Sequence, residues 1–110
     1  MTKVLMGSFG ALVRAGFDDI LSGQDIEILC TRDSDLLAEV DENLPDVVVI
    51  DLERDGAVEL AEHIVSEHPS LKVVACSSLH PTMRVFPPFR RGESYVSELR
   101  PDLFTDIVRT

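Results

Sequence analysis

The chain has 110 residues, of which 45% are hydrophobic and 27% are charged, and its formal net charge is −10. These totals predict one globular domain, residues 1–110, whose core needs no disulfide or metal, and they exclude a disordered chain. The strong negative charge excludes an electrostatic nucleic-acid binder, and we expect no contact of these residues with nucleic acid or with an anionic membrane.

The first part of the chain alternates short apolar runs with helical patterns. The apolar run at residues 3–6 predicts a strand, and Ser8 can cap a following helix that Gly23 ends. Residues 25–30 alternate polar and apolar side chains, which predicts a strand with one wetter face, as is typical of a sheet edge. Residues 33–44 have the pattern of an amphipathic helix.

The same alternation continues after these elements. Residues 46–50 are apolar on both faces, as a central parallel strand requires, and residues 71–76 form a second run of this kind. An amphipathic helix, residues 56–68, lies between them. A short strand pattern at residues 94–97 and a helix at residues 101–109 close the chain. This order predicts a parallel sheet with right-handed crossovers and helices on both faces.

Residues 79–93 interrupt the alternation where a helix should cross back to the sheet. Pro87 and Pro88 each lack a backbone N–H and crowd the preceding turn, so they exclude a long helix. We expect at most a short helical turn around residues 82–86.

Cys30 and Cys76 are the two cysteines, and they form no C-x-x-C pair. We expect buried free thiols in a reducing compartment. Because no apolar run is long enough for a signal peptide or a membrane span, we predict a cytoplasmic protein.

Ligands of open α/β sheets bind at the carboxyl ends of the strands, so the residues after each predicted strand are the candidates for chemistry. They are Gly7, Ser8, Phe9, Cys30, Thr31, Asp51, Ser77, Ser78 and Glu98. No base and nucleophile can be paired among them, and "GSFG" is too short for a phosphate-binding loop, so we predict that the chain is not an enzyme.

Four segments in this order resemble the receiver domain of two-component response regulators: "KVLM" with "LVRAGF", "LPDVVVIDLERDG", "HPSLKVVACSS" and "SYVSEL". The resemblance spans residues 3–109 and is nearest to the branch that usually carries a helix-turn-helix output domain. It implies a flavodoxin-like, doubly wound sheet of five parallel strands in the order 2-1-3-4-5, with the fourth helix shortened or lost.

The resemblance also implies roles for three residues. Asp51 falls on the phosphorylated aspartate, Ser77 on the hydroxyl that senses the phosphoryl group, and Tyr95 on the aromatic switch residue. The residues alone allow simpler interpretations. Asp51 can cap the turn after its strand, Ser77 can satisfy loop amides, and Tyr95 can be a core or half-buried aromatic. Glu53 can add a carboxylate to the carboxyl edge, but we favour its pointing to solvent.

Three departures from the family affect the phosphoryl chemistry. Ser8 and Phe9 stand where the family has an acidic pair, and Glu98 stands where it has a lysine. Phosphoryl transfer depends on Mg²⁺ and positioned cations, and carboxylates usually hold the Mg²⁺. With only Asp51 in place, we expect no metal and no cofactor. If Glu98 faces Asp51 closely, one of the two carboxyl groups should have a raised pKa. The alternative is that Glu98 points out to water, which the length of its side chain allows.

The segment "VFPPFRR" is a candidate contact surface because it combines apolar and basic side chains. Residues 68–110, which contain this segment, carry 4 acidic and 6 basic residues, a net of +2, whereas residues 1–67 carry 16 acidic and 4 basic residues, a net of −12. The alternative to a contact surface is that both phenylalanines fold inward and cover the sheet in place of the lost helix. The candidate residues are Val85, Phe86, Pro87, Pro88, Phe89, Arg90 and Arg91.

We therefore expect a degenerate receiver-like signalling module that binds a protein partner or self-associates through residues 80–110, independently of Mg²⁺-dependent phosphorylation. One alternative is a genuine phosphoacceptor that uses Asp51 with Mg²⁺. Another is the receiver part of a transcription regulator whose DNA-binding domain is not in this chain. A flavodoxin-like electron-transfer protein and a small hydrolase stay open as other classes. The first loop lacks the hydroxyl-rich phosphate cradle that flavin binding needs, and no base–nucleophile pair supports the hydrolase.

Overall fold

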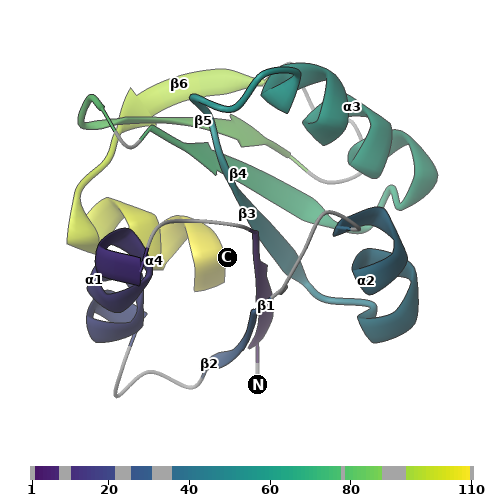
Figure 1. Ribbon diagram of the computed structural model, residues 1–110, viewed down its shortest axis with the longest axis horizontal. Coiled ribbons are helices and arrows are strands. Elements are labelled where there is room, and N and C mark those ends of the chain that lie inside the picture. Colours follow the sequence, from purple (N-terminus) through teal and green to yellow (C-terminus); the bar gives the residue numbers. More distant parts are fainter. Residues whose placement is uncertain are drawn as a thin grey trace.

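The computed structural model describes residues 2–7, 11–21, 26–30, 36–77, 79–87 and 94–109, and Figure 1 shows their arrangement. In chain order the elements are β1 (Thr2–Met6), α1 (Ala11–Leu21), β2 (Ile26–Cys30), α2 (Leu36–Asn43), β3 (Val47–Asp51), α3 (Ala57–Glu67), β4 (Lys72–Cys76), β5 (Thr82–Phe86), β6 (Tyr95–Glu98) and α4 (Pro101–Arg109). Every strand and helix predicted outside residues 79–93 is present, and β5 is an additional strand.

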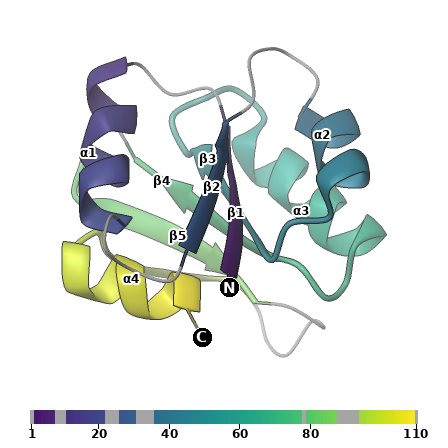
Figure 2. The same cartoon turned by 90° about the horizontal axis from the view of Figure 1, so that it is seen from below.

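Helices cover both faces of one sheet, as predicted. α1 and α4 lie on one face, and α2 and α3 lie on the other (Figures 1 and 2). Successive strand side chains point to opposite faces, so each pair of helices covers its own half of the core. Under α1 and α4 this core includes Val4, Met6, Phe17, Val49 and Phe104, and under α2 and α3 it includes Leu5, Val40, Ile50 and Ile64. No helix within the described ranges is long and apolar enough to cross a membrane.

The first four strands form the parallel part of the sheet. The order of all strands is β2-β1-β3-β4-β5-β6, and β2, β1, β3 and β4 run parallel. β3 is central, and Val47 to Ile50 are at most 3% exposed. The two-sided apolar run at residues 46–50 therefore correctly predicted a central strand, and β2 lies at the sheet edge as its wetter pattern indicated.

The expectation of five parallel strands is wrong, because residues 82–86 form β5 rather than a helical turn. β5 pairs antiparallel with β4, and β6 pairs antiparallel with β5. Only residues 77–81 separate β4 from β5, which suits an antiparallel return but is too short for a parallel crossover. "TMRVF" also alternates, with Met83 and Val85 buried on one face and Arg84 half-exposed on the other. The prolines after Phe86 therefore follow a strand instead of interrupting a helix.

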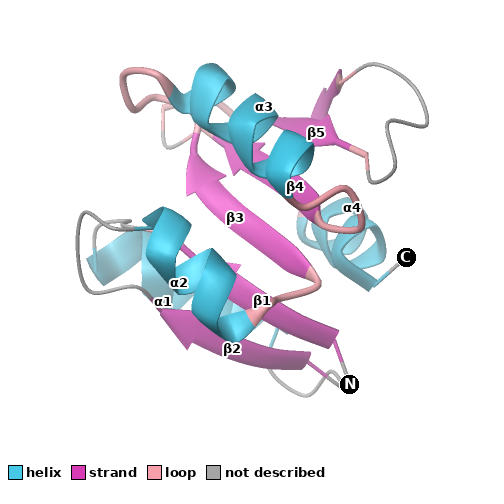
Figure 3. Cartoon of the chain, turned by 90° about the vertical axis from the view of Figure 1, so that its right-hand side faces the viewer, coloured by secondary structure: helices cyan, strands magenta, loops and turns pink. Residues whose placement is uncertain are grey.

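The additional strand moves β6 one position outward. β6 is the outermost strand on its side of the described sheet, beyond β5 (Figure 1), and β5 in turn lies beside β4 (Figure 3). Tyr95 and Val96 on β6 are 48% and 63% exposed. The described sheet is therefore mixed and six-stranded, and its final strand is exposed.

Candidate functional site

Asp51 is the last residue of β3 and lies at the carboxyl edge of the parallel strands. Its register partner is Cys76 on β4, and it continues the row of Val47 and Val49 toward α1 and α4. Its carboxylate is half-buried, and Oδ1 accepts the backbone N–H of Glu53 at 3.0 Å. Asp51 therefore caps the turn after β3, which is one of the two interpretations that the sequence left open.

Ser77 follows β4 at the same edge and is 6% exposed. Its hydroxyl donates to Glu53 Oε1 at 2.7 Å and accepts the backbone N–H groups of Leu79 and His80 at 3.1 and 2.9 Å. A hydroxyl has one proton and two lone pairs, so these three bonds use its full capacity. Ser77 satisfies loop amides, as the simpler interpretation predicted, and no hydrogen bond between the described residues joins it to Asp51.

Glu53 joins the site although the sequence favoured its pointing to solvent. The residue is exposed, and its carboxylate accepts a hydrogen bond from the hydroxyl of Ser77, so it adds a carboxylate to the edge as the other interpretation expected. The order of the strands predicts this contact. β3 and β4 are parallel neighbours, so the loops that leave their carboxyl ends start side by side. A Glu two residues beyond β3 is therefore long enough to reach the first residue beyond β4.

Cys76 is fully buried at the end of β4, in the core under α1 and α4. Burial, reinforced by the negative charge of Asp51, raises the pKa of its thiol far above the ordinary value. The thiol therefore stays protonated at neutral pH and is a poor nucleophile. The prediction of a buried free thiol is confirmed for Cys76, whereas the side chain of Cys30 lies outside the described part of the structure.

Glu98 and Tyr95 do not join this site. They lie on β6, three strands away from β3, which corresponds to about 14 Å at an ordinary strand spacing. The Glu98 carboxylate is instead 3.6 Å from the guanidinium of Arg100 and is 71% exposed. β4 and β5 lie between Asp51 and Glu98, so the two carboxylates do not face each other, and Glu98 points to water, as the alternative expected. Tyr95 is 48% exposed, so it is not a core aromatic.

Of the proposed contact segment at residues 85–91, the structure describes residues 85–87. Val85 is 2% exposed and Phe86 is 5% exposed, so neither can form the expected contact surface. Phe86 packs in the core under α3, as the inward-folding alternative predicted, and Pro87 is half-exposed. Outside the described residues lie Ser8, Phe9, Ser78, Pro88, Phe89, Arg90 and Arg91.

The structure thus brings Asp51, Glu53, Ser77 and Cys76 together at one edge of the sheet. In chemical terms the site offers two carboxylates, one saturated hydroxyl and one protonated thiol. Among the residues that the structure describes, no group of three or more His, Cys, Asp or Glu side chains is placed to hold a metal ion. The Ser77–Glu53 hydrogen bond connects the loop after β3 with the loop after β4, and this connection is the clearest role of the site.

No protein-family model matches the chain, and no curated protein and no solved structure matches it significantly. The structure by itself establishes an α/β domain with a doubly wound, mixed sheet whose first four strands are parallel.

Proposed function

We propose that this chain is a degenerate receiver-like signalling module that acts through protein–protein contacts and does not depend on phosphorylation of Asp51. The observation that carries the proposal is the 2.7 Å hydrogen bond from the hydroxyl of Ser77 to the carboxylate of Glu53. In the resembled family, the corresponding hydroxyl turns toward the phosphoryl group of the modified aspartate. Here a carboxylate of the chain itself already accepts that hydrogen bond.

Glu53 opposes phosphorylation of Asp51 in two ways. A phosphoryl group could recruit Ser77 only by displacing the carboxylate of Glu53, and a hydrogen bond to a charged group contributes about 1.5–3 kcal/mol. The phosphoryl group would also bring negative charge close to that carboxylate, which disfavours the modified state. The loop after β4 is consequently held in one arrangement without any modification.

The exposed strand β6 is the contact surface that best fits such a module. An outermost strand has backbone N–H and C=O groups that can pair with another chain, and natural proteins usually protect them. Here Tyr95 and Val96 leave apolar surface beside that edge. Residues 68–110 have a net charge of +2, whereas residues 1–67 have a net charge of −12, so two copies repel each other least through the end that contains β6.

The alternative is a genuine phosphoacceptor that uses Asp51 with Mg²⁺. It is favoured by the half-buried position of the Asp51 carboxylate, because a side chain at the carboxyl edge of β3 is accessible to a small phosphodonor. Mg²⁺ would then be held by this carboxylate together with the phosphoryl oxygens and water.

Intact mass after incubation with acetyl phosphate and Mg²⁺ tests the two functions against each other. We expect no added phosphoryl group on the wild-type protein or on Asp51→Asn, with both shown by circular dichroism to be folded. Fluorine NMR with beryllofluoride covers a short-lived adduct, and we expect no bound signal. A phosphoryl group on the wild type that is absent from Asp51→Asn would establish the phosphoacceptor instead.

Sedimentation velocity tests self-association through β6. We expect the wild type to form dimers and Val96→Lys to be monomeric, because a charge on this strand blocks edge pairing. Leu44→Lys is the matched control, since Leu44 is 68% exposed at the end of α2, far from β6 in the sheet order, and this variant should still dimerise. A wild-type monomer at every concentration would contradict self-association and assign the surface to a different protein.

A further inference from the structure

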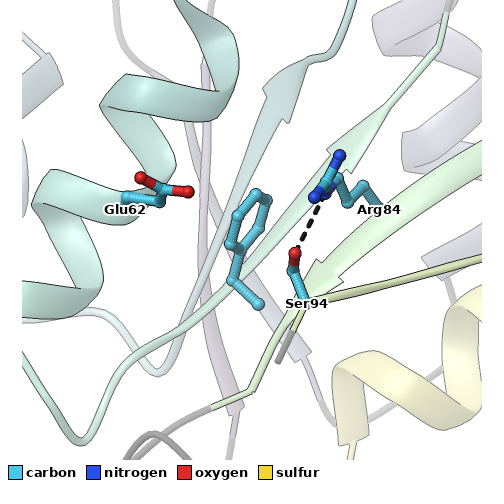
Figure 4. Close-up of a pocket in the computed structure, with 4 residues that line it drawn as sticks. Glu62, Arg84 and Ser94 are labelled. Atoms are coloured by element: carbon cyan, nitrogen blue, oxygen red, sulfur yellow. Dashed lines mark hydrogen bonds between the residues drawn. The ribbon is translucent and has the colours of Figure 1, made fainter. Parts of the chain in front are cut away.

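A cavity of about 380 Å³ lies between α3, β5 and the residue that precedes β6. It is separate from the edge that carries Asp51, and the proposed function does not use it. Its volume falls within the range of small-molecule sites, about 300–1,000 Å³. Four described residues line it: Glu62, Arg84, Phe86 and Ser94 (Figure 4).

The fold places the four residues together through strand alternation and antiparallel pairing. Arg84 and Phe86 are two positions apart on β5, so their side chains point to the same face of the sheet, toward α3. The register that pairs Arg84 with Val96 continues to bring Ser94 opposite Phe86. α3 crosses this face and contributes Glu62 as the opposite wall.

The guanidinium of Arg84 is held in place from two sides. Its Nε donates a hydrogen bond to Ser94 Oγ at 3.0 Å, and its Cζ lies 5.8 Å from the centroid of the Phe86 ring. Within the described part of the chain, its two terminal nitrogens make no hydrogen bond and no ion pair. An oriented guanidinium with both terminal nitrogens available is suited to bidentate binding of a carboxylate.

Glu62 supplies a negative charge on the other side of the cavity. Figure 4 shows its carboxylate, on α3, across the cavity from the guanidinium of Arg84 on β5. Among the described residues no ion pair joins Glu62 and Arg84, so the two charges are not neutralised by each other. The cavity therefore presents a positive wall, a negative wall and an aromatic side chain.

We propose that this cavity binds a small zwitterion whose carboxylate pairs with Arg84 and whose ammonium group pairs with Glu62. A short aliphatic segment between the two charges would lie against Phe86. A simple anion such as phosphate fits less well, because Glu62 and the net charge of −10 both repel it. A zwitterion adds no net charge to the protein and satisfies both walls, so it matches the site better than a ligand with one charge.

Amide NMR titrations with three probes that share a four-carbon chain test the proposal: γ-aminobutyrate, butyrate and n-butylammonium. We expect γ-aminobutyrate to shift the backbone signals of Arg84, Phe86 and Ser94 saturably. It should bind about twofold to fivefold more tightly than butyrate, which is the effect of one additional solvent-exposed ion pair. n-Butylammonium lacks the carboxylate and should bind more weakly than either.

Two variants test which side chain binds which charged group of the ligand. Glu62→Gln should reduce the affinity for γ-aminobutyrate to that for butyrate, and this substitution of an exposed residue leaves the core intact. Arg84→Met keeps the aliphatic part of the side chain and should lower the affinity for both γ-aminobutyrate and butyrate by about tenfold or more. Glu67→Gln is the control, because Glu67 is an exposed residue of α3 that does not line the cavity, and it should bind as the wild type does.

Three results would overturn the proposal. The first is the absence of saturable shifts around Arg84 in the folded wild type. The second is equal affinity for butyrate and γ-aminobutyrate, which would show that Glu62 contributes nothing. The third is an equal loss of affinity in Glu62→Gln and Glu67→Gln, which would reduce the effect to the overall charge of the protein.

Discussion

Replacing Phe104 with Ala is expected to lower the free energy of unfolding by about 3–5 kcal/mol, the range for deletion of a fully buried aromatic ring. Phe104 is 0% exposed, and its ring lies 5.0 Å from that of Phe17 in a tilted arrangement. The two rings join α4 to α1 on the same face of the sheet. Loss of the Phe104 ring leaves a cavity and removes the contact that holds α4 against α1. Urea denaturation followed by circular dichroism measures the change.

Asp106→Ala on the same helix is the matched control for this prediction. Asp106 is exposed, and substitution of an exposed residue usually changes the free energy of unfolding by less than about 0.5 kcal/mol. Both variants should keep the urea dependence of the wild type, because that dependence reports the surface exposed on unfolding. A loss of less than about 1 kcal/mol for Phe104→Ala would mean that α4 is not an integral part of the core.

The sequence predicted the parallel part of the fold because two signals agreed there. The runs at residues 46–50 and 71–76 are apolar on both faces, and only strands covered on both sides by helices can bury such runs. Amphipathic helical patterns separate the strands, which imposes crossovers. Gly7 adds a local signal after β1. Its N–H donates to the carbonyl of Val49 at 2.7 Å, and a Cβ at this position would lie 3.2 Å from that oxygen.

The sequence analysis missed β5 because two signals conflicted there. The alternation of strands and helices required a helix at residues 79–93, and Pro87 and Pro88 excluded a long one, so only a helical turn was left. The alternation of Met83, Arg84 and Val85 has a period of two and fits a strand, but five residues are too few to outweigh an expected architecture. The short connection after β4 was the decisive information, because it permits only an antiparallel return.

The candidate site was predictable in position but not in its connections. The carboxyl edge follows from topology, and it correctly contains Asp51 and Ser77. The hydrogen bond from Ser77 to Glu53 depends on side-chain conformations in two loops, and the hydrophobic periodicity of the sequence does not specify them. The distance of Glu98 from Asp51 depends on the strand order, and without β5 the sequence left open whether the two carboxylates face each other.

Above about pH 9, the buried thiol of Cys76 is expected to make the protein progressively less stable. The pKa of this thiol in the folded protein is raised above its ordinary value of 9.0, first by burial and then by the charge of Asp51. Above that value the unfolded chain loses the proton while the folded chain keeps it. The stabilisation is therefore complete below pH 9.0 and decreases by up to about 1.4 kcal/mol per pH unit toward the raised pKa.

Urea denaturation at about pH 9.5 and about pH 10.5 measures this slope, with Cys76→Ala as the comparison and Cys30→Ala present in both proteins to remove the second thiol. Cys76→Ala will be less stable overall, because it leaves a small cavity, but its stability should fall less steeply with pH. Burial lowers the pKa of Lys72, so this residue stabilises the folded protein as the pH rises toward 10.5. That effect is common to both proteins and cancels in the difference. Equal slopes would show that the thiolate is accommodated in the folded state, and Cys76 would then be an accessible group at the edge that carries Asp51.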